Sequence, residues 1–521
     1  MGINTVADII RVHGVERAEH VALVLGDRRM SWGELHERSC TMANLLASAG
    51  VSSEDRVAFL DKNGIEHFEV FFAAAMLNAV CVDVNWRLAG PEIEYIVNDA
   101  LAKVLVVGPD FVPVLQSIAP NLTTVKTILV IGKSEAEFDD YETAMAQHPS
   151  TDPGTPSGAA DIAFQLYSSG TTGRPKGVML TNDNFFGLLP VAKDIWEFDE
   201  HTVNLVAMPL FHIGGGGWAI AGMYNGCTSV ILRELDPAAL IRLFGQEGVT
   251  HAFLVPAVLQ FMLMVPGVEE ADYSTLKVFA YGASPISEEV LARSVKMFKC
   301  KFWQAYGLTE TTGTVVNLPP SDHDPDGPNK HRLRSCGLPG PGVELRIVDT
   351  DTLSDLSAGE VGEIWIRSPQ VMKGYWNMPD ETAMAITADG WFRSGDAGFV
   401  DDDGYLYIHD RVKDMIVSGG ENVYPAEVEN VLMAHPGIAD VAVIGVPHEK
   451  WGETAKAMVV RAPGSEVSEQ DVIDYAREHL ARFKCPTSVD WVDALPRNPS
   501  GKILKKDLRA PYWEGRSRNV N

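Results

Sequence analysis

Short apolar runs alternate with helical patterns through the first 150 residues of this chain of 521 residues. Residues 21–25, 56–60, 79–84 and 104–107 are short, mainly apolar runs, which are typical of strands. Between them we predict helices at residues 65–77 and before Asp99. A further helix, ending near residue 46, begins at a Ser-x-x-Glu capping box formed by Ser31 and Glu34. Strands that alternate with helices favour largely parallel sheets joined by right-handed crossovers.

The pattern changes toward the C-terminus. Helical patterns at residues 426–433 and 472–480 are interleaved with strand patterns at 441–444, 457–460 and 488–492, which predicts a small α+β unit. The charged segment from Asp410 to Asp414 precedes this unit and is typical of an exposed hinge. We therefore predict a large α/β domain of parallel or mixed sheets with flanking helices at residues 1–410. A small mobile α+β domain follows at residues 411–521, with its hinge at about 410–414.

Composition limits the classes of partner. The formal net charge of −27 argues against nucleic acid and against anionic membrane surfaces as main partners. No apolar run reaches the roughly 18 residues of a spanning helix, and the N-terminus lacks the order of a signal peptide. The six cysteines are scattered and none lies in a Cys-x-x-Cys pair, which argues against a zinc site or a disulfide framework. We expect a cytoplasmic protein with at most peripheral membrane contact.

One stretch, residues 167–177, has a composition that no hydrophobic core requires. It follows a strand-like run at 162–166 and holds four hydroxyl side chains, three glycines and two cations within ten residues. Glycines let backbone N–H groups converge on an anion, and hydroxyls and a lysine add donors and charge, so a polyphosphate is the natural ligand. The spacing of a Walker A loop fails at Pro175 and Gly177. The candidate phosphate-binding residues are Ser168, Ser169, Gly170, Thr171, Thr172, Gly173 and Lys176; a polar surface loop is the alternative.

Four consecutive glycines, 214–217, stand between His212 and Trp218. Such a run either leaves an empty volume beside the backbone or lets another group approach closely. The segment therefore fits the wall of a channel for an apolar substrate, and it fits equally a flexible loop with a core histidine.

Three further segments contain candidate nucleotide-binding residues. A turn of small residues, Gly282, Ala283 and Ser284, follows a strand-like run at 276–280 and suits either a flat ring lying against the backbone or a plain turn. Glu310 lies among hydroxyls, where a carboxylate holds magnesium or caps a helix. Asp396 lies beside glycines, where it accepts the hydroxyls of a ribose or simply stabilises a turn.

Two further charged features are an acidic segment at residues 401–404 and a lysine, Lys502. Residues 401–404, Asp-Asp-Asp-Gly, resemble the start of a calcium loop, but the ligand order fails, and we predict a solvated turn. Lys502 stands at the end of a Pro-, Ser- and Gly-containing loop where a helix begins. A lysine there reaches a phosphate or carboxylate as a mobile point charge, or is an ordinary surface residue.

In this order the segments resemble the adenylate-forming (AMP-binding, luciferase-like) superfamily, which includes acyl-CoA synthetases, luciferases and peptide-synthetase adenylation domains. The resemblance covers essentially the full chain, its motifs run from about residue 165 to 505, and it is closest to bacterial fatty acyl-CoA synthetases. It implies an acyl-CoA synthetase that uses ATP, Mg²⁺ and coenzyme A.

The resemblance also implies roles for individual residues. Thr172, His212, Glu310 and Lys502 would be catalytic, and magnesium would lie on Glu310 and Ser168. The segment from residue 168 to 176 would hold the phosphates. The adenine side would comprise Gly282, Ala283, Ser284, Gln304, Tyr306, Gly307 and Thr309, and the ribose contacts would be Asp396 and Arg411. The acyl pocket would be bordered by His212, Gly214, Trp218 and Tyr281.

The implied reaction has two halves. A carboxylate attacks the α-phosphate of ATP to give an acyl-adenylate and pyrophosphate, and a thiol then attacks the mixed anhydride. The resemblance implies a large rotation of the small domain between these halves, with Lys413 at the hinge. The rotation would bring Ser418, Gly419 and Gly420 to the pantetheine channel.

The identity of the acid is less constrained. The pocket segment lacks lysine, arginine and aspartate, which favours a hydrophobic carboxylate, and a medium- or long-chain fatty acid leads. An aryl, cinnamate-type, branched or polycyclic acid is the alternative substrate. An acyl-AMP ligase that loads a carrier protein, and a non-catalytic nucleotide-binding scaffold, are the alternative functions. The partners are thus small molecules, and a homodimer is allowed.

Overall fold

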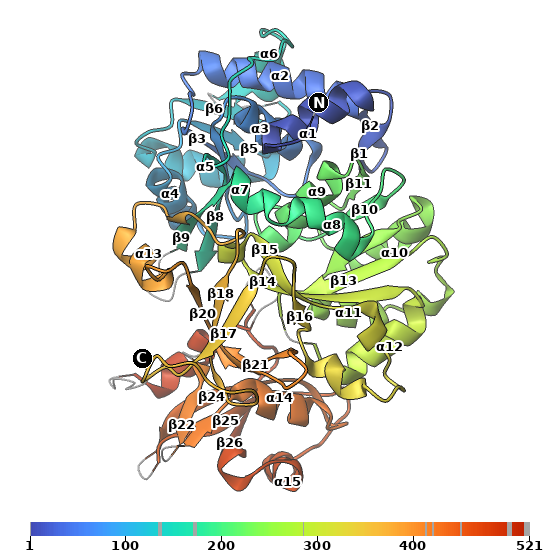
Figure 1. Cartoon of the computed structure of the whole chain (residues 1–521), viewed down its shortest axis with the longest axis vertical. Helices are drawn as coiled ribbons and strands as arrows, with labels where there is room; N and C mark the ends of the chain where they lie inside the picture. The colour runs from blue at the N-terminus through green and yellow to red at the C-terminus, as the bar shows by residue number, and fades with distance from the viewer. Residues whose placement is uncertain are drawn as a thin grey trace.

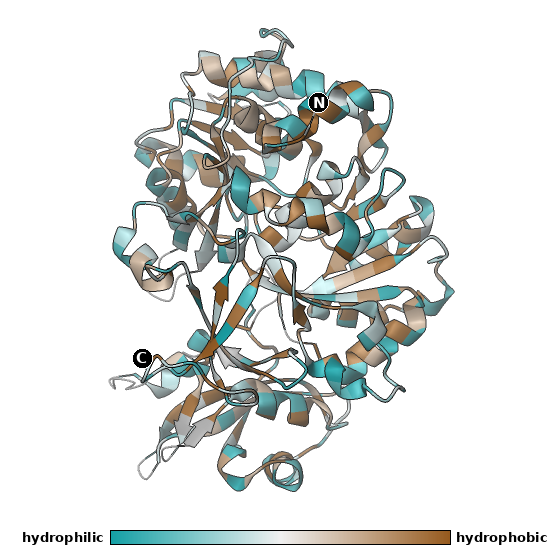
Figure 2. Ribbon diagram, in the orientation of Figure 1, coloured by the Kyte–Doolittle hydropathy of each residue, from teal (hydrophilic) through white to brown (hydrophobic). Residues whose placement is uncertain are grey.

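The computed structural model describes residues 2–133, 138–169, 175–284, 286–411, 414–418, 421–448, 451–497 and 503–514. Three sheets and their helices form a large N-terminal domain, and a fourth sheet forms a smaller C-terminal α+β domain (Figure 1). Apolar residues are concentrated on the strands, and polar residues on many of the outer helical turns (Figure 2). Among the described residues, no helix combines the length and apolar character that a bilayer span requires.

The first sheet of the large domain has eight strands. Its order is β19 (Gly374–Tyr375), β9 (Pro175–Thr181), β8 (Ile162–Ser169), β4 (Val80–Asp83), β3 (Arg56–Leu60), β5 (Val104–Val107), β6 (Thr127–Val130) and β7 (Asp139–Asp140). The strands from β8 to β7 pair in parallel, as the alternation of strands and helices predicts. At the other edge, β9 pairs antiparallel with β8, and β19 with β9.

The second sheet has nine strands. Its order is β16 (Leu338–Pro339), β15 (Gly313–Leu318), β14 (Lys301–Leu308), β13 (Val278–Gly282), β12 (His251–Leu254), β10 (Val203–Val206), β11 (Thr228–Ile231), β1 (Val21–Leu25) and β2 (Arg28–Ser31). The strands from β14 to β1 are parallel, and antiparallel strands close both ends. The sheet is therefore mixed.

Helices pack around these two sheets. They are α1 (Val6–Glu16), α2 (Trp32–Ser48), α3 (Ile65–Met76), α4 (Gly90–Asp99), α5 (Val112–Ile118), α6 (Tyr141–Met145), α7 (Asn182–Phe186), α8 (Leu189–Trp196), α9 (Ile213–Tyr224), α10 (Pro237–Gln246), α11 (Pro256–Leu263), α12 (Glu288–Phe298) and α13 (Pro379–Ala385). Helix α3 is buried along its whole length, because it contacts strands of both sheets. The predicted capping box is present at α2, where Glu34 N–H donates to Ser31 Oγ at 3.2 Å and Ser31 N–H donates to Glu34 Oε2 at 2.8 Å.

An antiparallel sheet leads from the large domain to the small one. It consists of β17 (Glu344–Val348), β18 (Gly362–Arg367), β20 (Phe392–Val400) and β21 (Leu406–Arg411). The acidic segment between β20 and β21 forms the predicted tight turn, in which Asp401 Oδ1 accepts from the N–H groups of Asp403 and Tyr405 at 3.0 and 2.9 Å.

The small domain is built on β23 (Glu421–Val423), β22 (Ile416–Ser418), β25 (Gly452–Arg461), β24 (Ile438–His448) and β26 (Ser488–Trp491). Helices α14 (Pro425–Met433), α15 (Glu469–His479) and α16 (Lys505–Arg509) accompany the sheet. The strands predicted at 441–444 and 457–460 are longer in the structure, because β24 and β25 form one continuous antiparallel pair. The main apolar cluster of this domain begins at Ile416 and the large-domain cluster ends at Leu406, so each part has its own core.

Candidate active site

The predicted phosphate segment lies at the tip of the β8–β9 hairpin. Across this hairpin Tyr167 pairs with Gly177 and Ser168 with Lys176. The register therefore holds Ser168 and Lys176 opposite each other on the two strands next to the edge strand β19 of the eight-stranded sheet. Residues 170–174 lie outside the described residues.

Glu310 meets the phosphate segment from the other sheet. It lies in the short helix η4 (Thr309–Thr311), directly after β14. The hydroxyl groups of Ser168 and Tyr375 both donate to Glu310 Oε1, each at 3.1 Å. The Lys176 ammonium stands 4.9 Å from the centre of the Tyr375 ring. The structure thus brings three predicted residues together with a fourth, Tyr375, which sequence reasoning missed because a lone tyrosine on a two-residue strand carries no distinguishing pattern.

The backbone around Glu310 is tightly held. Thr311 Oγ1 accepts from Leu308 N–H at 2.9 Å, and Gln370 Nε2 donates to Thr311 O at 3.3 Å. Met372 N–H donates to Glu310 O at 2.8 Å. A Cβ at Gly307 would lie 1.8 Å from Gly313 O, so the chain needs glycine there. Glu310 therefore projects from a fixed turn toward the hairpin.

The oxygen atoms at this point suit a hard cation. Hydroxyl and carboxylate oxygens are ligands that Mg²⁺ accepts. Within the described part of the chain, both hydrogen bonds to the Glu310 carboxylate reach Oε1 and none reaches Oε2. The donor set of Ser168 and Glu310 thus fits a magnesium ion.

The ends of β13 and β14 form a smooth backbone surface beside Glu310. Gly282 pairs with Ala305, and a Cβ at Gly282 would lie 2.0 Å from Ala305 O. Ala283 adopts φ 64°, a left-handed conformation that is uncommon for a residue with a side chain. With its amide nitrogen turned toward the backbone, Gln304 can donate to Cys336 O at 2.9 Å and to Ser335 O at 3.1 Å. The small residues are thus required by the packing of β13 on β14, and a flat ring lying against this backbone stays a prediction.

Asp396 lies close to this surface. It is 7 % exposed on β20, where it accepts a hydrogen bond on Oδ2 from the Tyr306 hydroxyl at 2.8 Å. Asp396 pairs in register with Arg411 on β21. The tertiary structure thus joins the predicted adenine segment to the predicted ribose residues.

His212 caps the N-terminus of α9. Its Nδ1 accepts from Gly214 N–H at 3.2 Å, and burial lowers the pKa of His212 to about 4. The ring is therefore neutral at pH 7, and its proton is on Nε2. His212 is thus suited to donate one hydrogen bond, not to supply a positive charge.

The four glycines lie in α9, so the flexible loop is not present, and the wall of a channel for an apolar substrate stays a prediction. A Cβ at Gly215 would lie 2.2 Å from Pro209 O, and one at Gly216 would lie 2.8 Å from Leu210 O. A run of glycines either leaves an empty volume or permits a close approach, and close approach of another backbone applies at Gly215 and Gly216. The helix is pressed against the segment that leads into it.

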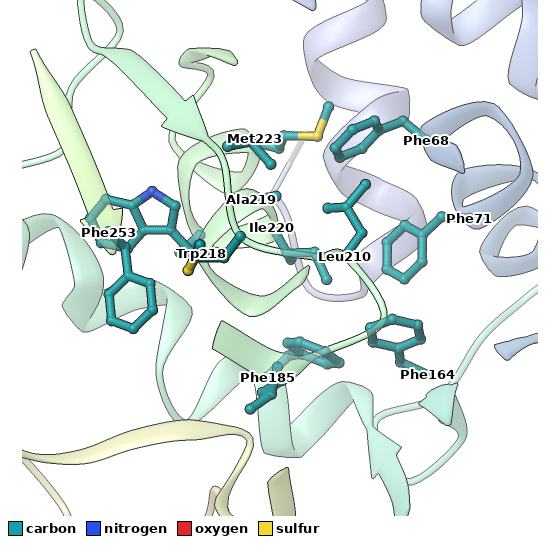
Figure 3. Packing of buried hydrophobic residues seen from close by; sticks show 14 of the residues in the cluster. Phe68, Phe71, Phe164, Phe185, Leu210, Trp218, Ala219, Ile220, Met223 and Phe253 are labelled. Atoms are coloured by element: carbon teal, nitrogen blue, oxygen red, sulfur yellow. The ribbon is translucent and has the colours of Figure 1, made fainter. Parts of the chain in front are cut away.

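Trp218 and Tyr281 were predicted to border one pocket, but they lie on opposite faces of the nine-stranded sheet. Trp218 packs on Phe253 with ring centres 5.8 Å apart (Figure 3). Phe253 pairs with Ala280, and the next residue, Tyr281, must point to the other face. There the Tyr281 hydroxyl donates to His323 Nε2 at 3.0 Å. His212, Gly214 and Trp218 remain on one side of the sheet, and Tyr281 belongs to another layer.

The Trp218 side chain is held in one orientation by a hydrogen bond and by neighbouring rings. Its indole N–H donates to Leu205 O at 3.2 Å, and its ring also packs against Trp196 and Phe198 at 5.1 and 5.0 Å. A Cβ at Gly214 would lie 3.1 Å from Phe253 Cε1, so Gly214 belongs to the same group.

Several predicted site residues fall outside the described residues. They are Gly170, Thr171, Thr172, Gly173, Lys413, Gly419, Gly420 and Lys502. For Ser169 and Arg411 only the backbone is described. Ser418 is described, and it pairs with Gly452 on β25. Ser284 and Thr309 are described too, at the end of β13 and the start of η4.

A second group of potential metal ligands lies in the core. His67, Cys81 and Asp83 bring their ligand atoms within 4.8 Å of one another. His67 Nε2 lies 2.7 Å from Asp83 Oδ2, and Cys81 Sγ donates to Asp83 Oδ1 at 3.5 Å. Burial raises the pKa of the Cys81 thiol well above its ordinary value, whereas a metal ligand must be a thiolate. We interpret the group as a hydrogen-bonded part of the core.

Two family profiles match the chain. The profile described as AMP-binding enzyme matches residues 11–376, and that described as AMP-binding enzyme C-terminal domain matches residues 427–502. Together they span both sides of the predicted hinge.

Relatives and solved structures agree with these matches. The chain is 40% identical to a fatty acid–[acyl-carrier-protein] ligase, ScoC, of Streptomyces coeruleorubidus, over 100% of this chain and 98% of that one. It is 37% identical to the long-chain-fatty-acid–CoA ligase FadD13 of Mycobacterium tuberculosis, over 93% and 94%. The structure of the anthranilate CoA ligase AuaEII in complex with anthranoyl-AMP has a TM-score of 0.91 at 27% identity and covers 98% of each chain.

Proposed function

Because this chain belongs to the AMP-binding enzyme family, we propose that it activates a hydrophobic carboxylic acid with ATP and passes the acyl group to coenzyme A. A carboxylate oxygen bonds to the α-phosphorus of ATP as the bond to pyrophosphate breaks. The thiolate of coenzyme A then bonds to the carbonyl carbon of the acyl-adenylate, AMP leaves, and the thiol proton passes to solvent. The contact between Ser168 and Glu310 carries this proposal, because it unites the phosphate segment with the magnesium motif.

Little bond-making chemistry is asked of the protein. It must align two anions that repel each other and compensate the charge of the departing pyrophosphate. Ser168 and Lys176, with the neighbouring residues 169–173, would hold the β- and γ-phosphates. Glu310 and Ser168 would hold a magnesium ion, which when bound neutralises phosphate charge.

The remaining residues orient the nucleotide and the acid. Asp396, with Arg411, would accept the ribose hydroxyls, and the surface at Gly282 would take the adenine ring. The neutral His212 would donate its Nε2–H toward the acid. An N–H group can donate to a carboxylate oxygen, and the neutral imidazole adds no positive charge that would retain the product.

A medium- or long-chain fatty acid is the proposed substrate. Two relatives, ScoC and FadD13, are named as ligases of fatty acids. Gly214, Trp218 and Phe253 form an apolar surface beside His212. An aryl acid is the second candidate, because the solved structure of AuaEII is a complex with anthranoyl-AMP.

The thiol acceptor is the other open choice. Coenzyme A is favoured by FadD13 and AuaEII, while ScoC is named for an acyl carrier protein. A non-catalytic scaffold is disfavoured by the hydrogen bonds that orient Glu310 and Asp396.

Pyrophosphate exchange over a panel of acids tests the proposal. We expect ATP-dependent exchange with C8–C18 fatty acids to exceed exchange with cinnamate, anthranilate and malonate. Coenzyme A and a carrier protein are then supplied in parallel with the best acid. Absence of exchange with every acid would support a scaffold, and thioester formed on the carrier protein alone would overturn the coenzyme A assignment.

Lys502→Ala separates the two half-reactions. Lys502 would lie between the carboxylate and the α-phosphate in the first step, so its loss should lower adenylate formation by about 10²-fold or more. Thioester formation from a supplied acyl-adenylate should stay near the wild-type rate. Lys506→Ala, four residues away, is the matched control. Equal losses in both half-reactions would contradict this role.

A further inference from the structure

A buried arginine lies behind the phosphate segment without an ion-pair partner among the described residues. Arg56 is 5 % exposed on β3, and its Nη2 makes no hydrogen bond to any described group. Its Nη1 donates to Glu54 O at 2.6 Å, and its Nε donates to Gln165 Oε1 at 3.3 Å. A cation is costly to bury without a compensating contact, and that contact here is aromatic.

The aromatic partner is Trp376. The Arg56 guanidinium carbon lies 3.5 Å from the centre of the Trp376 ring, a short cation–π distance. Arg56 belongs to the interior of the eight-stranded sheet, and Trp376 directly follows its edge strand β19. The stack therefore joins the centre of the sheet to the end of its edge.

Trp376 is also bound to the stem of the phosphate hairpin. Its N–H donates to Gly177 O at 2.7 Å, and its indole N–H donates to Asp99 O at 2.8 Å. A Cβ at Gly177 would lie 2.7 Å from Gln165 Nε2 and 3.2 Å from Trp376 Cβ. Gly177 is thus clamped between the two side chains that hold Arg56.

The opposite strand of the stem enters the same network. Tyr167 pairs with Gly177, and its hydroxyl donates to Asp99 Oδ2 at 2.6 Å. Gln165 Nε2 donates to the same hydroxyl at 3.3 Å. Both ends of the phosphate segment are therefore fixed by one set of side chains.

The residue before Trp376 reaches the metal side of the site. Tyr375 donates to Glu310 Oε1 at 3.1 Å, and its ring lies under the Lys176 ammonium at 4.9 Å. A displacement of Trp376 would move Tyr375 with it, because the two residues are adjacent in the chain. The phosphate segment and the Glu310 carboxylate thus both depend on the position of Trp376.

We propose that Arg56 is a positioning residue for nucleotide binding, which acts through its stack on Trp376 to fix the stem of the phosphate hairpin and the Tyr375–Glu310 contact. In this role Arg56 would act without contacting the nucleotide. The inference rests on the proposed function only in that the hairpin binds the phosphates of ATP.

The test measures equilibrium binding of a fluorescent ATP analogue without any acid, together with the thermal midpoint. Arg56→Lys keeps the charge but loses the planar stack and the Nε bond, and Trp376→Leu removes the ring. Each should weaken binding about tenfold, whereas Trp376→Phe, which retains a ring, should stay within about threefold of wild type.

The small domain supplies a matched control. Arg461 stacks on Trp491 at 3.7 Å, far along the chain from the hairpin. Arg461→Lys removes a similar stack and should lower the thermal midpoint without changing binding of the analogue.

The outcomes distinguish the two hypotheses. Wild-type protein that fails to bind the analogue would overturn the proposed function. Wild-type affinity in Arg56→Lys and Trp376→Leu, or an equal loss in Arg461→Lys, would overturn the positioning role. Should Arg56→Lys not fold, the difference between Trp376→Phe and Trp376→Leu decides, because equal affinities for these two would count against the stack.

Discussion

At the scale of single residues, burial keeps several histidines neutral. Burial lowers the pKa of His212, His251 and His323 to about 4 each. His323 accepts from the Tyr281 hydroxyl on Nε2 and contacts Pro319 O through Nδ1 at 2.9 Å. Burial penalises the charged imidazolium, so the fold favours the neutral form.

This gives a stability that depends on pH. The folded protein holds the pKa of His323 at about 4, below the ordinary value of 6.5. Between these values the unfolded chain binds more protons, so stability is fully present above about pH 6.5 and decreases as pH falls toward 4. The contribution of His323 is at most about 3 kcal/mol.

His323→Gln should therefore reduce the pH dependence of the urea midpoint between pH 6.5 and 4.5. His201, whose side chain is 81% exposed, offers His201→Gln as the control, which should leave the dependence unchanged. An unaltered pH dependence in the His323 variant would refute this account.

At the scale of elements, the conformation of α9 depends on particular glycines. Gly215 meets backbone oxygens of Pro209 and Met208, at 2.2 and 2.6 Å from an added Cβ, and these cannot rotate away. An added Cβ at Gly217 meets only the Ile213 side chain, Cδ1 at 3.2 Å and Cγ1 at 3.4 Å, which can move. The same residue type thus has different constraints at two positions of one helix.

Gly215→Ala and Gly217→Ala form a matched pair. Overpacking against backbone should cost Gly215→Ala about 3 kcal/mol in the free energy of unfolding. Gly217→Ala should change it by less than about 1 kcal/mol, because the gain in helix propensity offsets a small shift of Ile213. Chemical denaturation checks both, and comparable costs would show that the close approach does not determine the sequence.

At the scale of the whole molecule, charge is distributed unevenly between the two parts. Residues 411–521 contain 15 Lys and Arg against 16 Asp and Glu, a net charge of −1, while the whole chain has −27. The large domain therefore carries nearly all the negative charge. A domain with this charge repels polyanions, so under the proposed function the near-neutral small domain with its lysines is the part better suited to approach the phosphates of ATP.

Rotation of the small domain would change which of these cations faces the nucleotide. Lys413→Pro restricts the backbone at the predicted hinge and should block thioester formation while pyrophosphate exchange continues. Lys413→Ala, which leaves the backbone free, should retain both activities. Normal overall turnover in the proline variant would contradict the hinge assignment.

Much of the fold and part of the site could be predicted from local sequence. Ser31 with Glu34 marked the start of α2, because a capping box is satisfied within four residues. The alternation of strands and helices predicted the parallel sheets. The lengths of β24 and β25 were underestimated. The ends of these two strands are stabilised by pairing with each other and not by a local pattern.

Other features depended on contacts between distant segments. Tyr375 had no local signal, and only the pairing of β19 with β9 brings it to Glu310. Trp218 and Tyr281 fitted one pocket by order along the chain, but strand alternation sends them to opposite faces. The glycine run 214–217 fitted a loop by its local pattern, but it is helical in the structure, where the backbone of Pro209 and Leu210 lies against α9.

The sequence by itself determined the kind of chemistry, because hydroxyls, glycines, cations and carboxylates in that order provide donors and acceptors whatever their positions in space. It also determined the two-part organisation, through the change of hydrophobic period. Only the tertiary structure decided which donors share a site. Hydrogen bonds and aromatic stacking act over a few ångströms, and those that join Ser168, Glu310 and Tyr375, or Arg56 and Trp376, connect residues too distant in the chain for any local pattern to pair.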